Sequence, residues 1–192
     1  MLSRLYKWTM AQAAHRHAAR ALAAVSFIES SIFPIPPDVM LLPMILARRE
    51  RAWAYAALAT AASVAGALVG YGLGFFLFDT IGRPLLEFYG YMDKFAAFQT
   101  TFNDQGAWLV FFFGITFFPF KVITIASGVA QLNLTVFLLA SLAARSLRFF
   151  IVAGLLWLFG EPVRQFVEKR LALVTTVVMA LLLGGFALVK FL

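Results

Sequence analysis

The chain has 192 residues, of which 62% are hydrophobic and only 13% are charged, and it contains no cysteine and a net charge of +7. An average soluble domain carries about 25% charged residues, so the composition excludes an ordinary water-soluble protein, and the missing cysteines exclude disulfides and thiolate metal sites. The basic residues stand in short groups between apolar runs, so we expect an integral membrane protein that binds no nucleic acid.

The N-terminal quarter of the chain combines a basic segment with a proline-broken apolar stretch. Residues 1–17 are basic with interspersed apolar positions and lack the compact apolar region of a signal peptide, so we expect an amphipathic segment on the cytoplasmic membrane surface. The apolar stretch 18–47 follows. It is broken by Pro34, Pro36 and Pro37, which forbid a continuous helix because they remove amide donors. Each half is too short to cross a bilayer, so we expect a re-entrant hairpin rather than one kinked span.

The next apolar run, 53–78, is long enough for one transmembrane helix. Within it Gly66, Gly70 and Gly74 recur at every fourth position, which predicts a face that allows close packing of another helix. The residues that follow, 79–104, are more polar but rich in phenylalanine. We expect them to form an external interfacial segment.

A second broken stretch, 107–130, is interrupted at Pro119, and we expect another re-entrant hairpin there. The runs 134–159 and 171–192 are each long and apolar enough to cross a membrane. The predicted fold is therefore an all-α integral membrane protein with two opposed re-entrant hairpins and three transmembrane helices.

An internal repeat supports this fold. A shift of 85 residues places residues 27–34 over residues 112–119, with three of eight positions identical. Each half then contains a broken hairpin, a short loop and a long span, and the two halves enter the membrane from opposite sides. Paired interrupted segments of this kind are typical of inverted repeats with a transport site near the middle of the membrane.

The distribution of basic residues predicts the orientation. With two hairpins and three spans, residues 1–20 and the loops 48–51 and 161–170 fall on one side with ten Lys and Arg residues, against Arg83 and Lys94 on the other. The positive-inside rule then places the N-terminus in the cytoplasm. If either broken stretch were a full span, this asymmetry would be lost.

Five ionisable residues remain inside the apolar runs: Glu29, Asp38, Lys121, Arg145 and Arg148. A charge at the centre of a membrane helix costs about 2.5 to 3.5 kcal/mol, so we expect these side chains to be paired or hydrated in one polar cavity. The excess positive charge suits a phosphate group, which the two arginines and the lysine would bind. The two carboxylates would take up and release protons. The alternative is that the charges only cross-link the two halves.

Enzymatic functions find little support in the residues. The chain has no HExxH motif, and His15 and His17 both lie outside the apolar runs, which leaves an intramembrane serine without a base. An aspartyl dyad of Glu29 and Asp38 is opposed by the basic residues expected nearby. We therefore expect no enzymatic activity, no bound metal and no cofactor.

Three motifs together resemble one known family. They are Glu29-Ser-Ser-Ile-Phe-Pro-Ile-Pro-Pro-Asp38, Phe118-Pro-Phe-Lys-Val-Ile-Thr-Ile-Ala-Ser-Gly128 and Ala144-Arg-Ser-Leu-Arg-Phe-Phe150. Over residues 18–160 the chain resembles the DedA family, whose common core is the VTT or SNARE-associated domain, and in particular its small YqaA-like branch. The resemblance implies a protein of the bacterial inner membrane that moves lipids such as phosphatidylethanolamine or undecaprenyl phosphate between leaflets, with or without proton coupling.

The resemblance also bears on individual residues. The functional carboxylates and arginines of the family carry over onto Glu29, Asp38, Arg145 and Arg148. Many DedA proteins have an arginine just before the second proline break, where this chain has Thr116. The expected partners are membrane lipids and protons, with a homo-oligomer as an open question. Two other functions stay open, a proton-coupled carrier of a small ion and a membrane scaffold without transport.

Overall fold

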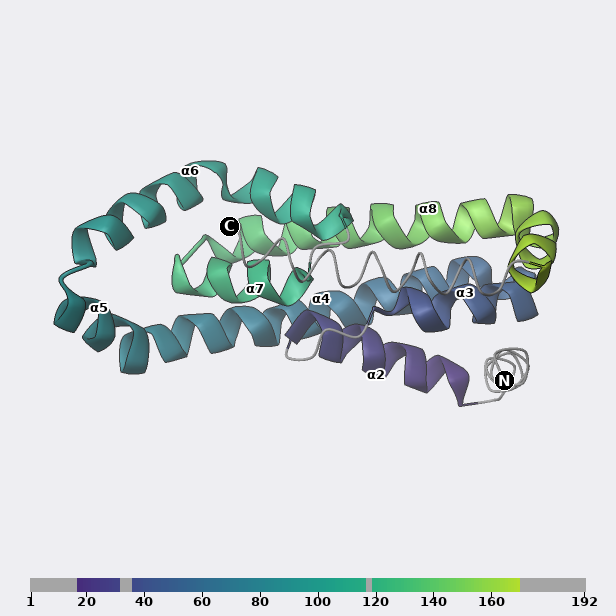
Figure 1. The fold of residues 1–192 in the computed structure, drawn as a ribbon, viewed down its shortest axis with the longest axis horizontal. Coiled ribbons are helices and arrows are strands. Elements are labelled where there is room, and N and C mark those ends of the chain that lie inside the picture. The colour runs from purple at the N-terminus through teal and green to yellow at the C-terminus, as the bar shows by residue number, and fades with distance from the viewer. Residues whose placement is uncertain (1–16, 32–35, 117–118, 170–192) are drawn as a thin grey trace.

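The computed structural model describes residues 17–31, 36–116 and 119–169 (Figure 1). The described part of the chain is helical throughout and contains no strand, which confirms the predicted all-α class. Residues 1–16 of the predicted N-terminal segment, Pro34 and the whole predicted C-terminal span 171–192 lie outside the described residues.

The first proline break separates two helices, α2 (Ala18–Ser31) and α3 (Asp38–Ala47). Pro37 immediately precedes α3, where a missing N–H costs nothing because the first amides of a helix have no intrahelical partner. In Figure 1, α2 runs toward the middle of the molecule and α3 runs back toward the same end. The two helices therefore form a helical hairpin, with the end of α2 and the start of α3 near the molecular centre.

A long, nearly continuous helical segment follows the first hairpin. Its parts are the 3-10 turn η1 (Arg49–Arg51), α4 (Ala52–Leu77), the π-helical turn η2 (Phe78–Gly82) and α5 (Arg83–Tyr89). The segment is apolar and long enough to cross a membrane, but it extends eleven residues beyond the expected end at residue 78. It stops at Gly90, whose φ of 68° is the left-handed conformation that glycine adopts without strain.

Three further helices complete the described chain: α6 (Met92–Ile115), α7 (Phe120–Val129) and α8 (Leu134–Lys169). Helix α6 also departs from the expected boundaries, since it runs through residue 104, where the external segment was expected to end. Polar residues at this place have partners inside the fold. Gln99 and Asn103 both donate to the carbonyl of Ala130, just after the end of α7. These polar side chains of the expected interfacial segment thus cap the end of a neighbouring helix.

Helix α8 contains the second candidate span, Leu134–Gly160, close to the predicted residues 134–159. Its helical geometry is interrupted at Phe159, with φ −112° and ψ 18°, shortly before Pro162. At this kink Arg49 donates a hydrogen bond to the carbonyl of Trp157. The basic loop at 48–51 and the end of the α8 span therefore lie at the same end of the molecule, as the charge pattern predicts.

The same order of elements occurs twice. A helix, a proline break, a ten-residue helix and a long helix form α2–α3–α4 and again α6–α7–α8. In Figure 1 the two hairpins open toward opposite ends, and α4 and α8 run in opposite directions. The two halves are therefore inverted with respect to each other, which supports the predicted inverted repeat.

Helix α4 lies against both hairpins, and its glycines make this contact possible. A Cβ atom at Gly66 would lie 2.1 Å from the carbonyl oxygen of Phe27 in α2, and one at Gly74 would lie 2.1 Å from that of Ile125 in α7. Gly70 lies between them and faces both hairpins. The predicted packing face is confirmed, because no larger residue leaves room for the two backbones.

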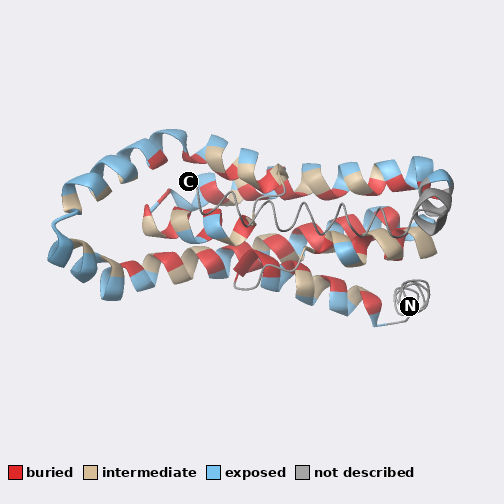
Figure 2. Cartoon of the chain, viewed as in Figure 1, coloured by how far each residue is buried: buried red, intermediate tan, exposed pale blue. Residues whose placement is uncertain are grey.

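Two apolar clusters form the core, and Figure 2 shows their buried faces turned toward the interior of the bundle. The first joins α2, α3, α4 and α8 and includes Leu22, Leu41, Met44, Ile45 and Phe149. The second joins α4, α6, α7 and α8 and includes Ala67, Val110, Phe120, Ile123 and Phe137. The buried polar residues lie around the meeting point of the two hairpin tips.

We expect Gly66→Ala and Gly74→Ala to destabilise the protein by about 1 to 3 kcal/mol, the usual range for overpacking a tight contact. Gly72→Ala is the matched control, because nothing lies within 4 Å of a Cβ at this position on the same helix. It should leave stability unchanged or raise it slightly, since alanine favours helix more than glycine. Thermal unfolding of the purified protein, followed by tryptophan fluorescence, measures the difference. Equal melting of all three variants would contradict the packing role.

Candidate functional site

Four of the five charged residues predicted to share a cavity meet at the centre of the fold. The first hairpin supplies Glu29 from the last turn of α2 and Asp38 from the first residue of α3. Helix α8 supplies Arg145 and Arg148, which share one helix face because they are three positions apart. The side chains form two ion pairs, each joining one arm of the hairpin to α8.

The first ion pair is buried. The Nη2 atom of Arg145 lies 2.7 Å from the Oε2 atom of Glu29, and its Nε donates to the Ser63 hydroxyl at 2.7 Å. Ser30 donates to the same Glu29 oxygen at 3.1 Å, and its hydroxyl lies 2.6 Å from that of Ser63. This network joins α2, α4 and α8. Its hydrogen bonds offset part of the cost of burying two charges.

Aromatic rings close off the Arg145 guanidinium. Its central carbon lies 4.8 Å from the ring centre of Phe120 and 4.7 Å from that of Phe149, at distances where a cation is attracted to the ring. The Arg145 side chain is only 1% exposed. In this conformation the guanidinium is enclosed by protein.

The second ion pair is less enclosed. The Nη2 atom of Arg148 lies 2.5 Å from the Oδ2 atom of Asp38, and the two side chains are 10% and 15% exposed. The position of Asp38 in the first turn of α3 also favours a negative charge, because the helix dipole is positive there. Its other oxygen, Oδ1, is buried and has no hydrogen-bond partner among the described residues. This carboxylate is therefore only partly satisfied.

The second pair also connects the two hairpins. Arg148 donates through Nη1 to the carbonyl of Thr116, just after the end of α6. Nearby, the Thr124 hydroxyl of α7 donates to the carbonyl of Ser30 in α2 at 3.1 Å. The tips of both hairpins therefore converge on the charged residues of α8.

The remaining predicted residues lie close to this centre. Lys121 is half-buried in the first turn of α7, next to Phe120, and belongs to neither of the two ion pairs. Because the four paired charges cancel, the excess positive charge of the predicted cluster equals that of Lys121. Pro119 precedes α7 as Pro37 precedes α3, so the prolines mark equivalent positions in the two hairpins.

Several partners of the charged residues were not predicted from the sequence. The predicted span 53–78 contains one serine and one threonine, Ser63 and Thr60, so a search for such polar residues finds Ser63 together with one other candidate. Phe120 and Phe149 carry no such signal, because the chain contains 22 phenylalanines. Their contact with Arg145 depends on how three helices are rotated about their axes.

The fold and the site together define a helical membrane protein with a charged centre between two opposed hairpins. Comparison with known families gives a more specific assignment, because the VTT domain model matches residues 35–158. The chain therefore belongs to the VTT domain family, that is, the DedA or SNARE-associated family. The match covers α3, α7, the first candidate span and all but the last two residues of the second candidate span.

Two relatives share most of the chain. An uncharacterized protein of Haemophilus influenzae is 33% identical over 186 residues, which cover 97% of this chain and 96% of the relative. The uncharacterized protein HI0703 homolog of Histophilus somni is 40% identical over 168 residues, or 85% of this chain and 87% of the relative. No solved structure matches.

Because Arg145 is enclosed by protein, we expect its substitution to lower the stability of the fold strongly. We expect Arg145→Met to cost about 3 to 5 kcal/mol, because it leaves Glu29 buried without a counter-charge. The double variant Glu29→Leu/Arg145→Met should regain most of this loss, since Ser30 and Ser63 still pair with each other. The melting temperature of each purified variant provides the measurement.

The exposed pair Asp79–Arg83 offers a control for this experiment. Its side chains are 52% and 49% exposed, so Arg83→Met should change stability by less than about 1 kcal/mol. If Arg145→Met were no more harmful than Arg83→Met, the buried pair would not hold the helices together.

Proposed function

We propose that the protein moves a phosphate-bearing lipid between the two leaflets of a membrane, without enzymatic chemistry. The observation that carries this proposal is the Arg148–Asp38 pair at the meeting point of the two hairpin tips. An arginine guanidinium binds phosphate oxygens through two parallel hydrogen bonds. Membership of the VTT domain family supports a membrane function of the DedA type.

Arg148 and Arg145 have different roles in the proposed transport. Arg148 is the first phosphate ligand, because its side chain reaches the surface and its carboxylate partner is only partly satisfied. The predicted contact of Arg145 with phosphate requires a rearrangement that uncovers its guanidinium. In the present conformation Arg145 holds Glu29 and positions α8. Lys121 adds a third cation at the tip of the second hairpin.

Proton exchange at Asp38 would release and restore Arg148. Once Asp38 carries a proton, its attraction to the guanidinium falls, and a phosphate oxygen takes its place on Arg148. Loss of that proton regenerates the carboxylate, which displaces the phosphate. Each cycle transfers one proton to and from Asp38 and breaks no covalent bond. Glu29 is the second candidate for proton exchange, on a slower path because its pair is enclosed.

The lengths of the short helices support re-entrant hairpins. With ten residues each, α3 and α7 are about 15 Å long, half of the roughly 30 Å hydrocarbon core. Helices that start at the central tips therefore reach one membrane surface only. Broken backbone at membrane depth is tolerated where protein surrounds it. Described residues beside each break contact other helices, since Ser30 lies against Gly70 of α4 and Thr116 accepts a hydrogen bond from Arg148 of α8.

Leaflet exchange in proteoliposomes tests the function. We expect the wild-type protein to move at least one of three labelled lipids: phosphatidylethanolamine, an anionic phospholipid or undecaprenyl phosphate. Arg148→Ala and Asp38→Asn should slow this exchange about tenfold or more, the effect of losing one charged hydrogen bond. Arg83→Ala removes a guanidinium outside the site and should behave as wild type.

The same experiment separates the alternatives when it is run with and without a pH gradient. Ion flux that depends on the gradient, with no lipid exchange, would favour a proton-coupled carrier of a small ion. Folded wild-type protein that moves neither lipid nor ion would contradict the proposal and favour a scaffold. Faster exchange under a gradient would indicate proton coupling.

The proposed location is the inner membrane of a bacterium, with the basic end in the cytoplasm. Because the chain has no cysteine, single-cysteine labelling tests this directly. Arg51→Cys should react with a membrane-impermeant maleimide only after cells are opened, whereas Tyr89→Cys should react in intact cells with a permeable outer membrane. Both positions are exposed at opposite ends of the long helical segment. The reverse pattern would invert the orientation.

A further inference from the structure

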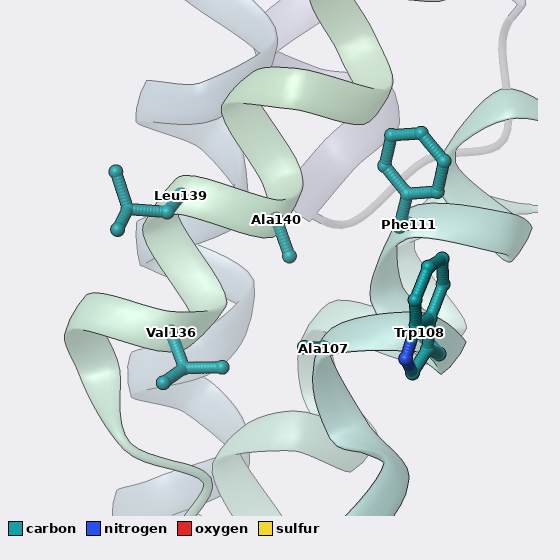
Figure 3. A pocket seen from close by; sticks show the side chains of 6 residues that line it. All are labelled: Ala107, Trp108, Phe111, Val136, Leu139 and Ala140. Atoms are coloured by element: carbon teal, nitrogen blue, oxygen red, sulfur yellow. The ribbon is translucent and has the colours of Figure 1, made fainter.

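A groove of about 460 Å³ runs between α6 and α8 (Figure 3). Its lining consists of three residues of each helix: Ala107, Trp108 and Phe111 of α6, and Val136, Leu139 and Ala140 of α8. All six side chains are apolar, and those of Trp108 and Leu139 are 75% and 63% exposed. The groove is open to the outside and lies beyond the buried core of the bundle.

Close packing of the two helices fixes the ends of the groove. A Cβ at Gly106 would lie 2.5 Å from the Leu132 side chain, and one at Gly114 would lie 2.6 Å from the Cβ of Ala144. Helix α6 is thus held against Leu132, just before α8 begins, and against Ala144 of α8, at two levels about 12 Å apart along α6, the rise of eight helical residues. Between these levels the small side chains of Ala107 and Ala140 leave the space that forms the groove.

The groove is continuous with the outer surface of a candidate span. Helix α8 exposes apolar residues such as Leu142 and Leu155 along Leu134–Gly160. In a membrane protein such a surface contacts lipid chains. The groove is a recess in this surface, so a hydrocarbon chain enters it from the membrane without crossing water.

Both walls of the groove lead toward the second ion pair. Arg148 lies eight residues beyond Ala140 on α8, or about 12 Å along the helix axis, and it contacts the carbonyl of Thr116, five residues beyond Phe111. One leaflet of hydrocarbon is about 15 Å deep, half of the membrane core. A lipid chain that starts from a phosphate at Arg148 is therefore long enough to reach the groove.

We propose that this groove holds one hydrocarbon chain of the transported lipid, with the lipid phosphate at Arg148. This inference rests on the proposed lipid transport. It adds a chain-binding site to the phosphate site. Between the two sites the lipid lies on the outer surface of the bundle, because the Gly114–Ala144 contact closes the seam between α6 and α8. The lining offers no charged group, so selectivity for the head group comes from the ion pair and the groove selects an extended chain.

Filling the groove tests the proposal. Ala140→Phe places a large side chain between the walls, and Ala61→Phe makes the same change at an exposed position of α4 outside the groove. In vesicles of phosphatidylcholine with head-group-labelled phosphatidylethanolamine, Ala140→Phe should slow exchange about tenfold, because the lipid chain loses its apolar contacts with the groove. Ala61→Phe should match wild type. As a control for folding, both variants must have melting temperatures close to that of the wild type.

Photo-crosslinking identifies the occupant independently of transport. A diazirine analogue of leucine at position 139 of the full chain should form adducts with phospholipid, and Ala140→Phe should abolish them. A product that joins position 139 to a peptide from residues 171–192, or to a second copy of the chain, would overturn the proposal.

The two experiments distinguish failure of the groove from failure of the function. Wild-type protein that moves no lipid contradicts the proposed transport, while the crosslinking result still decides whether the groove binds a chain. Wild-type exchange that Ala140→Phe leaves unchanged contradicts the groove alone.

Discussion

A buried charge in a membrane protein needs a counter-charge and hydrogen bonds, and the ion pair of Arg145 with Glu29 meets this requirement. The pair joins α8 to α2, and Ser63 adds α4 to the same network. Because the guanidinium is 1% exposed, these three helices must keep their relative rotation for the charge to remain satisfied. This constraint positions α2 of the first hairpin, and the second hairpin meets it through Phe120, whose ring lies against the guanidinium.

The fold must also satisfy backbone groups that the proline breaks leave without helical hydrogen bonds. Two proline breaks bring unpaired backbone groups to the centre of the fold, and lipid offers them no partners. Glycines on one face of α4 let both hairpin tips approach, while Arg148 and Thr124 donate to the carbonyls of Thr116 and Ser30 at the breaks. The glycines of α4 thus allow the proline-broken segments to pack closely, and the side chains of Arg148 and Thr124 satisfy backbone carbonyls beside the breaks.

The two arginine–carboxylate ion pairs therefore differ in their roles: one stabilises the fold, and the other is accessible to a ligand. The Arg145–Glu29 pair is enclosed by two phenylalanine rings and stabilises the bundle. The Arg148–Asp38 pair is more exposed, and it retains a carboxylate oxygen without a partner among the described residues. A pair that is incompletely satisfied is the one that a ligand displaces at lower cost. This difference in enclosure is the physical basis for assigning lipid contact to Arg148.

Sequence alone determined the membrane class, the two candidate spans, the proline breaks and the charged residues, because these depend on local composition and on the absence of an amide hydrogen in proline. It did not predict that residues 92–115 form one helix across the expected end of the interfacial segment at residue 104, where Asn103 donates to the carbonyl of Ala130 just after α7. Only the tertiary structure decided which arginine meets which carboxylate. Spacing places Arg145 and Arg148 on one helix face, but the partner of each depends on the rotation and depth of α2 and α3 against α8, which are set by packing across the whole fold.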